Sequence, residues 1–173
     1  GVVVEKDKRE LGMRMRAGVR YRAQSAGRYA SARQAPIAAW VVRVARIGVP
    51  TVDLRFKSGD AEAIEREVRA AVQAVQGTGS LLFINDHWQV ALAAGAYGVH
   101  LGQEDLDALQ AQQVAALRAS GARLGVSTHG YAEMLRAAAV GPSYIAMGAV
   151  FPTTLKRMAT APQGVARLAT YAS

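Results

Sequence analysis

The sequence predicts an α/β fold of the (β/α)₈ barrel type on three observations. Short apolar segments alternate with amphipathic ones at a regular period from about residue 35 onward. The apolar segments are nearly continuous, which is typical of strands buried on both faces of a parallel sheet. Polar or ionisable residues end five successive strands, and no Gly-x-Gly-x-x-Gly follows any of them. Because function in a barrel collects at the carboxyl ends of the strands, a barrel is favoured over a doubly wound dinucleotide fold.

Each element is predicted from the spacing of its apolar residues and from the residues that end it. Residues 37–47 have apolar side chains three and four positions apart, and Gly48 and Pro50 follow them, so a helix is expected. The β-branched segment 51–57 predicts a strand. A carboxylate at the start of 60–76 and a glycine after it predict a second helix. Further strands are expected at 81–84, 97–101, 123–126 and 144–147, and further helices at 87–94, 105–120, 131–140 and 163–171.

Length and composition indicate one globular domain. The 173 residues are 51% hydrophobic and 20% charged, which excludes a wholly disordered chain. No apolar run approaches the ~20 residues needed to span a bilayer, and no secretory signal is expected. The chain has no cysteine, so disulfides and zinc-thiolate sites are excluded. A cytoplasmic protein without membrane contact is therefore expected.

Charge divides the chain into a basic N-terminal extension, residues 1–34, and a barrel domain, residues 35–173. The extension has nine Lys and Arg against three Asp and Glu, a net charge of +6, and the rest of the chain has a net charge of +2. A solvated or disordered extension is the expected state. Tyr21 and Tyr29 are its only aromatic residues, too few for a stacking platform, so nucleic acid is not expected as a partner.

Side chains at the predicted strand ends suggest a site for a diphosphate. Asp86 and Asp105 follow consecutive strands, and carboxylate oxygens suit a hydrated Mg²⁺. Cations and hydroxyls that suit phosphate oxygens stand at the other strand ends: Arg55, Lys57, Lys156, Ser127, Thr153 and Thr154. The expected role of such a site is to position reactants and to stabilise charge on the leaving oxygens. No Ser/His/Asp or Cys/His arrangement points to covalent catalysis.

Particular strings of residues resemble the thiamine phosphate synthase family. They are Phe-Ile-Asn-Asp at 83–86, Gly-Val-His-Leu-Gly-Gln-Glu-Asp at 98–105, Gly-Val-Ser-Thr-His at 125–129, Phe-Pro-Thr-Thr-Leu-Lys at 151–156 and Ala-Pro-Gln-Gly at 161–164. The resemblance covers roughly residues 37–171 and is strong from Leu81 onward. It implies a (β/α)₈ barrel that joins hydroxymethylpyrimidine diphosphate to a thiazole phosphate with Mg²⁺. The products would be thiamine phosphate and pyrophosphate, formed through a pyrimidine cation that the thiazole nitrogen captures.

The same resemblance implies a role for each site residue. Asp86 and Asp105 are the expected Mg²⁺ ligands, and Thr153 is expected to hold the thiazole phosphate. The residues expected to act in catalysis and to contact the pyrimidine diphosphate or released pyrophosphate are Arg55, Lys57, Asn85, Ser127 and Lys156. A homo-oligomer is implied as well.

The chain departs from the family pattern at several positions. Asp53 replaces an amide expected to face the pyrimidine, and Leu155 stands where a second threonine is expected. The first barrel strand is expected near residues 29–34, where the sequence is polar. The pattern ends after its sixth helix, so an incomplete barrel without the last two βα units is expected.

Plainer interpretations stay open beside the functional ones. Asp86 and Asp105 also suit the N-terminal ends of helices, where the macrodipole favours carboxylates. His100 is expected to be a hydrogen-bonded core residue, and His129 either a donor to a ligand or a cap of loop backbone, so neither joins the catalytic set. Two functions from other classes remain as alternatives to the synthase. One is a thiazole-phosphate isomerase-like relative, and the other is a catalytically silent truncated barrel that acts as a binding protein.

Overall fold

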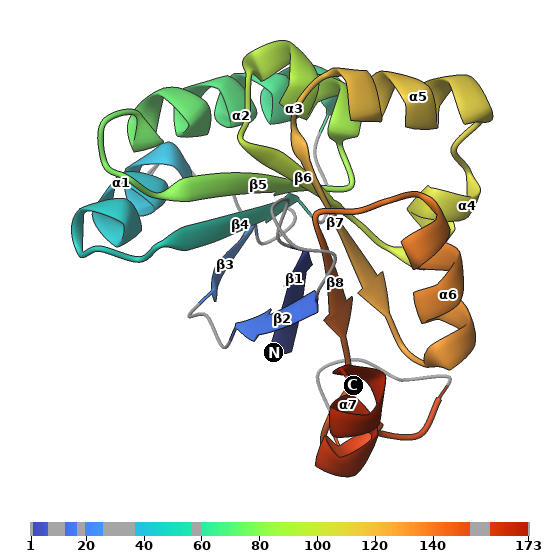
Figure 1. Cartoon of the computed structure of the whole chain (residues 1–173). Helices are drawn as coiled ribbons and strands as arrows, with labels where there is room; N and C mark the ends of the chain where they lie inside the picture. Colours follow the sequence, from blue (N-terminus) through green and yellow to red (C-terminus); the bar gives the residue numbers. More distant parts are fainter. Residues whose placement is uncertain are drawn as a thin grey trace. The chain divides into compact units, whose positions relative to one another are not determined.

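The computed structural model describes residues 2–6, 13–16, 20–25, 37–56, 60–152 and 160–172, which form an α/β fold. The chain divides into two compact units (Figure 1). The first unit consists of residues 19–100 and 120–122, and the second of residues 1–18, 101–119 and 123–173. Each unit is built of strands and helices of its own.

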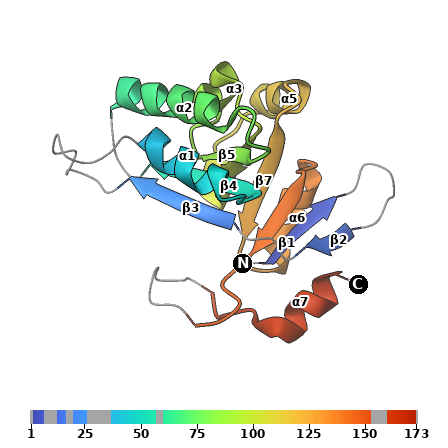
Figure 2. The same ribbon diagram turned by 90° about the vertical axis from the view of Figure 1, so that its left-hand side faces the viewer.

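The first unit contains a parallel sheet whose strands are joined by helices. Its strands lie in the order β6-β5-β4-β3, and the hydrogen-bonded ladders are parallel throughout. In Figures 1 and 2, α1 and α2 lie along one face of β4 and β5. The elements are β3 (Arg20–Ser25), α1 (Ile37–Arg46), β4 (Thr51–Phe56), α2 (Ala61–Val75), β5 (Leu81–Asn85), α3 (Trp88–Ala94) and β6 (Gly98–Leu101), of which only the last residue belongs to the second unit.

The continuous apolar strands of the first unit are buried on both faces, as the sequence predicted. All four residues of β6 are buried, as are the last four residues of β5. Helix α2 begins at a side-chain cap, since Asp60 Oδ1 accepts a hydrogen bond from the Ala63 amide at 2.7 Å. Its inward stripe, Ile64, Val68 and Ala71, has the three- and four-residue spacing that places these side chains on one helix face.

The second unit combines a parallel strand pair with two antiparallel strands. Strands β7 and β8 are parallel, β1 is antiparallel to β8, and β2 is antiparallel to β1. The elements are β1 (Val2–Lys6), β2 (Met13–Arg16), α4 (Gln103–Asp107), α5 (Ala111–Ala119), β7 (Arg123–Thr128), α6 (Tyr131–Ala139), β8 (Tyr144–Met147) and α7 (Gly164–Ala172).

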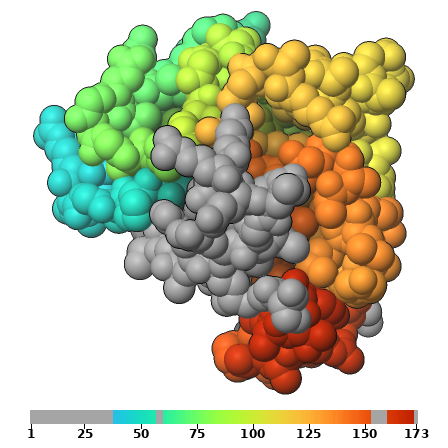
Figure 3. Space-filling model, in the orientation of Figure 1, coloured from blue at the N-terminus to red at the C-terminus, as the bar shows by residue number. Residues whose placement is uncertain are grey.

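Side-chain contacts join the helices of the second unit. The Arg118 guanidinium of α5 donates hydrogen bonds to the carbonyls of Ala139 and Val140 at the end of α6, at 3.1 and 2.9 Å. Helices α5 and α6 are accordingly neighbours on the surface (Figure 3). The rings of Tyr131 in α6 and Tyr171 in α7 stack with centroids 5.7 Å apart. No helix within the described ranges is long and apolar enough to cross a membrane.

The structure corrects the prediction of one helix over residues 105–120. Two helices, α4 and α5, stand there instead. The Gln110 amide is bonded to the Gln113 side chain at 2.8 Å, so this side chain caps the start of a new helix. Asp105 is the third residue of α4 and not its first, because the helix begins two residues earlier at Gln103.

The strand that pairs with β4 lies earlier in the sequence than residues 29–34, where the first barrel strand was predicted. Strand β3, residues 20–25, pairs in parallel with β4, whereas residues 29–34 lie outside the described residues. A sheet ladder is made by backbone groups, so a polar segment can supply a strand that apolar content does not indicate. Strands β1 to β3 all lie within the basic extension, whose boundary at residue 34 stays a prediction.

Candidate functional site

The first unit brings Asn85 into contact with Asp53, the residue that departs from the family pattern. Both side chains are buried, with 3% and 0% of their surface exposed. Strands β4 and β5 are neighbours, and the Asn85 Nδ2 group donates a hydrogen bond to Asp53 Oδ1. Asp53 is therefore engaged inside the sheet with one of the predicted site residues.

Arg55, near the end of β4, and Asp86, directly after β5, form an ion pair in the same unit. Arg55 Nε lies 3.6 Å from Asp86 Oδ2, and the two side chains are 41% and 26% exposed. An ion pair this exposed adds little to stability because water screens it. Both charged groups are accessible to a ligand, which is what a binding site requires.

Asp86 takes its position from the way β5 ends. Its φ of 66° is left-handed, a conformation that aspartate adopts more readily than most residues. Its amide donates to the His100 carbonyl of β6 at 3.0 Å, and its own carbonyl accepts from the Trp88 amide at 3.0 Å, where α3 begins. The turn thus places a carboxylate at the carboxyl end of the sheet. His100 is 2% exposed, which confirms its prediction as a core residue.

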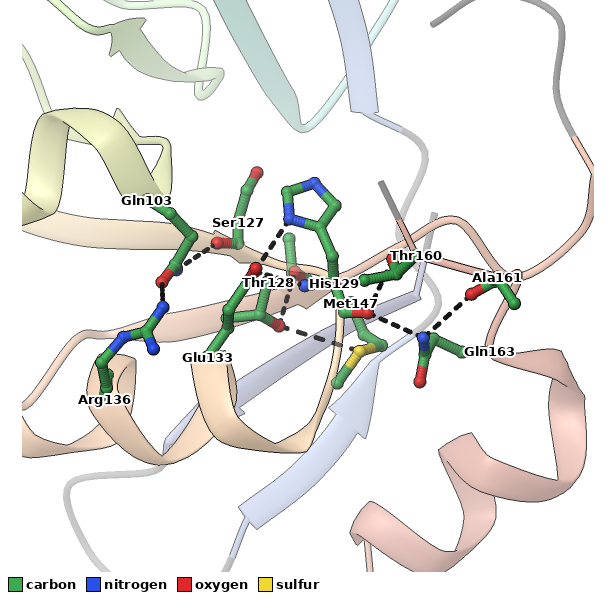
Figure 4. Close-up of polar contacts among 11 residues, drawn as sticks. Gln103, Ser127, Thr128, His129, Glu133, Arg136, Met147, Thr160, Ala161 and Gln163 are labelled. Carbon is green, nitrogen blue, oxygen red and sulfur yellow. Dashed lines mark hydrogen bonds and ion pairs between the residues drawn. The ribbon is translucent and has the colours of Figure 1, made fainter. Parts of the chain in front are cut away.

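In the second unit, the end of β7 is tied to α4 and α6 by side chains (Figure 4). The Gln103 Nε2 group donates to the Ser127 carbonyl at 2.7 Å, and Gln103 Oε1 accepts from the Arg136 guanidinium at 3.2 Å. Figure 4 shows the amide of Gln103 between the other two residues. The contact fixes the backbone of Ser127, the residue predicted to bind diphosphate oxygens.

His129, two residues beyond Ser127, is held by α6 and by the segment before α7. Glu133 Oε2 lies 2.8 Å from both the backbone amide and the Nδ1 atom of His129. The His129 carbonyl accepts from Gln163 Nε2 at 2.7 Å and from Thr160 Oγ1 at 3.3 Å. Of the two predicted roles for His129, its backbone contacts with Glu133, Thr160 and Gln163 support the structural one.

Asp105 stands at the start of α4, where its carboxylate also stabilises the helix. Its Oδ2 atom accepts from the Gly102 amide at 3.3 Å, and nothing described bonds to Oδ1. Oδ2 therefore has the helix-stabilising role that was one of the two interpretations of Asp105, and Oδ1 is available to a ligand. Asp105 lies in the second unit and Asp86 in the first.

The described residues contain no group of three or more His, Cys, Asp or Glu side chains arranged to hold a metal ion. A Mg²⁺ site does not need such a group, because Mg²⁺ takes one or two carboxylates and completes its shell with water and substrate phosphate. The carboxylates of Asp86 and Asp105 are ligands of this kind. Four other residues predicted for the site lie outside the described residues: Lys57, Thr153, Thr154 and Lys156. Leu155, which departs from the family pattern, lies outside them as well.

Sequence reasoning did not assign the residues that support the site. Gln103 lies inside a string that carried the family resemblance, but no role followed from its side-chain chemistry alone. Glu133 and His129 are four positions apart, a spacing that brings side chains together on a helix and that gives a usable signal. The contact between Gln163 and His129 spans 34 positions, and no local pattern indicates it.

Comparison with known proteins identifies a family for the chain. The model of the family described as thiamine monophosphate synthase matches residues 27–173. A thiamine-phosphate synthase of Neisseria meningitidis serogroup A is 54% identical over 136 residues, which are 79% of this chain and 65% of the relative. That of Serratia proteamaculans is 50% identical over 129 residues, 75% of this chain and 59% of the relative.

A solved structure shares the fold. It is a thiamine phosphate pyrophosphorylase from Pyrococcus furiosus, with a TM-score of 0.61 and 28% sequence identity over 78% of this chain and 61% of that one. The chain thus spans about 59% to 65% of the length of these relatives. The family match covers well over half of the chain, and the identities far exceed those of proteins that share only a fold. The chain belongs to the thiamine monophosphate synthase family.

Proposed function

We propose that this chain acts as a thiamine phosphate synthase, a transferase of thiamine biosynthesis. It would condense hydroxymethylpyrimidine diphosphate with thiazole phosphate to give thiamine phosphate and pyrophosphate. The observation that carries the proposal is the 54% identity to a protein named thiamine-phosphate synthase. The matched strings, which contain the candidate site residues, support it further.

The proposed diphosphate site includes Arg55, Asn85 and Ser127 from the ends of three strands. The exposed guanidinium of Arg55 supports this role, because a planar cation binds two phosphate oxygens at once. Ser127 contributes a hydroxyl that can donate to a developing oxyanion. Lys57 and Lys156 are proposed as further cations by the motif, and Thr153 as the residue that holds the thiazole phosphate.

The proposed Mg²⁺ ligands are Asp86 and Asp105. The fit rests on their chemistry, since both side chains supply oxygen ligands, and among the described residues no hydrogen bond reaches Asp105 Oδ1. Bound there, Mg²⁺ would neutralise charge on the diphosphate. Arg55 pairs with Asp86 at 3.6 Å and would bring a second positive charge to the same group.

The architecture proposed for the assembled site is a (β/α)₈ barrel. Parallel β3 to β6, with α1 and α2 along one face of β4 and β5, support it (Figures 1 and 2). The substrates are proposed to be small molecules, the assembly a homo-oligomer, and the location cytoplasmic, as the absence of cysteine suggests.

The test is pyrophosphate release by this chain with Mg²⁺ and both substrates, compared between the native protein and three variants. Asp86→Asn and Asp105→Asn remove one charge each and are expected to lower kcat/KM by at least about a hundredfold. Asp107→Asn is the matched control, because Asp107 is an exposed carboxylate of the same short helix as Asp105. Full turnover in the first two variants would remove the metal assignment.

A further inference from the structure

We infer that Gln103 is a positioning residue that holds the end of β7 against the start of α4, so that Ser127 and Asp105 present their polar atoms to one diphosphate. The inference rests on the proposed function and extends it to a residue with no assigned role. Gln103 is the first residue of α4, two positions before Asp105, and its side chain reaches the Ser127 carbonyl across 2.7 Å. One side chain thus connects two proposed binding residues.

The orientation of the Gln103 amide follows from its partners. Arginine has only donors, so Arg136 must face the amide oxygen, 3.2 Å away. The amide nitrogen must then face the Ser127 carbonyl, which has only acceptor lone pairs. The hydrogen bonds from Arg136 to Gln103 and from Gln103 to Ser127 therefore allow a single orientation of the Gln103 amide. Turning the amide over would break both of them.

This arrangement makes Gln103 more than a packing residue. The bond to the Ser127 carbonyl fixes the backbone at the residue whose hydroxyl is proposed to bind diphosphate oxygens. Gln103 also lies between Gly102 and Asp105 in the sequence, and the Gly102 amide donates a hydrogen bond to Asp105 Oδ2. A displacement of about 1 Å at a positioning contact can lower a rate about a hundredfold, so this link is expected to matter for binding.

Glutamate at position 103 separates the positioning role from a structural one. Gln103→Glu keeps the size of the side chain and strengthens the pairing with Arg136, so the fold is retained. It turns the donor that faces Ser127 into an acceptor, which leaves two oxygens opposed. Gln113→Glu is the matched control, because the Gln113 oxygen only accepts from the Gln110 amide and glutamate can do the same.

The experiment measures steady-state turnover against hydroxymethylpyrimidine diphosphate and titrates Mg²⁺-pyrophosphate by calorimetry. Gln103→Glu is expected to raise the KM for the diphosphate and the Kd for Mg²⁺-pyrophosphate about tenfold or more, while the KM for thiazole phosphate and the melting temperature change little. A merely structural role would instead lower the melting temperature and leave both KM values unchanged. Unchanged constants in a stable Gln103→Glu protein would overturn the inference.

Arg136 provides a second, independent variant. Arg136→Met removes the group that orients the amide and is expected to weaken diphosphate binding in the same direction. Arg136→Lys keeps a donor and is expected to restore much of it. Arg118→Met, which also removes a guanidinium that contacts α6, is the control and is expected to leave both constants unchanged.

The two proposals fail in different ways. If the native chain forms no thiamine phosphate, the proposed function fails before any variant is compared. If the native chain turns over and the variants at 103 and 136 match it, the positioning inference fails and the proposed function stands.

Discussion

The buried contact between Asp53 in β4 and Asn85 at the end of β5 shows how a residue that departs from the family pattern is accommodated. Asp53 departs from the family pattern at a position expected to face the pyrimidine. In the structure it is fully buried and accepts a hydrogen bond from Asn85. The amide of Asn85 is thereby oriented, since its nitrogen faces the carboxylate. Asp53 thus holds the side chain of Asn85, a contact that the sequence could not specify.

Removing the Asn85 amide is expected to destabilise the fold. Asn85→Ala takes a donor from a carboxylate that is 0% exposed, and a buried polar group that loses a partner lowers the free energy of unfolding by about 1–3 kcal/mol. Urea denaturation monitored by circular dichroism measures the change. Gln73→Ala, on the exposed face of α2, serves as the control and is expected to stay within about 0.5 kcal/mol. Equal stability of both variants would contradict the importance of the Asn85 contact.

Some residues of the candidate site were proposed from the chemistry of one side chain alone. A carboxylate and a cation near strand ends singled out Asp86 and Arg55 as candidates, and the structure pairs them at 3.6 Å. The roles of Gln103 and Arg136 depend on partners 24 and 33 positions away, respectively. Such contacts are set by the fold, so local sequence patterns do not reveal them.

Strands β7 and β8 approach so closely at one point that only glycine fits. Gly125 is paired with Tyr144 in the ladder, and a Cβ atom on Gly125 would lie 2.0 Å from the tyrosine ring. Gly125→Ala is therefore expected to displace a buried ring and to lower the free energy of unfolding by about 1–3 kcal/mol or more. Thermal denaturation tests this.

The control for the glycine prediction is Gly130→Ala. A Cβ atom at Gly130 meets nothing within 4 Å, so the melting temperature should hardly change. Combining Gly125→Ala with Tyr144→Leu should recover part of the lost stability, because the smaller side chain removes the clash. A melting temperature unchanged by Gly125→Ala alone would show that the strands can separate at this point.

The start of α2 gives a prediction about helix capping. The Asp60 carboxylate accepts from the Ala63 amide at 2.7 Å, and loss of such a cap typically lowers stability by about 0.5–2 kcal/mol. Asp60→Ala is expected to fall in that range, and Asp60→Asn, which keeps a cap oxygen, below it. Chemical denaturation of the two variants checks the order, and equal losses would contradict it.

Most elements of the first unit were predictable because each is a local pattern. The predicted helix at 37–47 corresponds to α1, and the predicted helix at 60–76 to α2. The break between α4 and α5 was not predictable, since it depends on a single side-chain cap from Gln113 within a continuously helical pattern. The antiparallel pairing of β1 with β8 joins segments more than 130 positions apart and has no local signature either.

At the scale of the whole molecule, the family is established and the activity is proposed. The match spans residues 27–173, and the relatives named thiamine-phosphate synthase are 46% to 54% identical. Short strings around strand ends predicted this family from the sequence, because a diphosphate site requires particular residue types at particular strand ends. The parallel pairing of β4, β5 and β6 was likewise predictable from doubly buried strands.

The most direct test of the proposed function is detection of the product. The purified chain is incubated with Mg²⁺, hydroxymethylpyrimidine diphosphate and thiazole phosphate, and thiamine phosphate is quantified by mass spectrometry alongside pyrophosphate. We expect equal amounts of both products, with neither formed when Mg²⁺ or either substrate is omitted, and strongly reduced formation by Asp86→Asn. Folded protein that forms no thiamine phosphate under these conditions would contradict it.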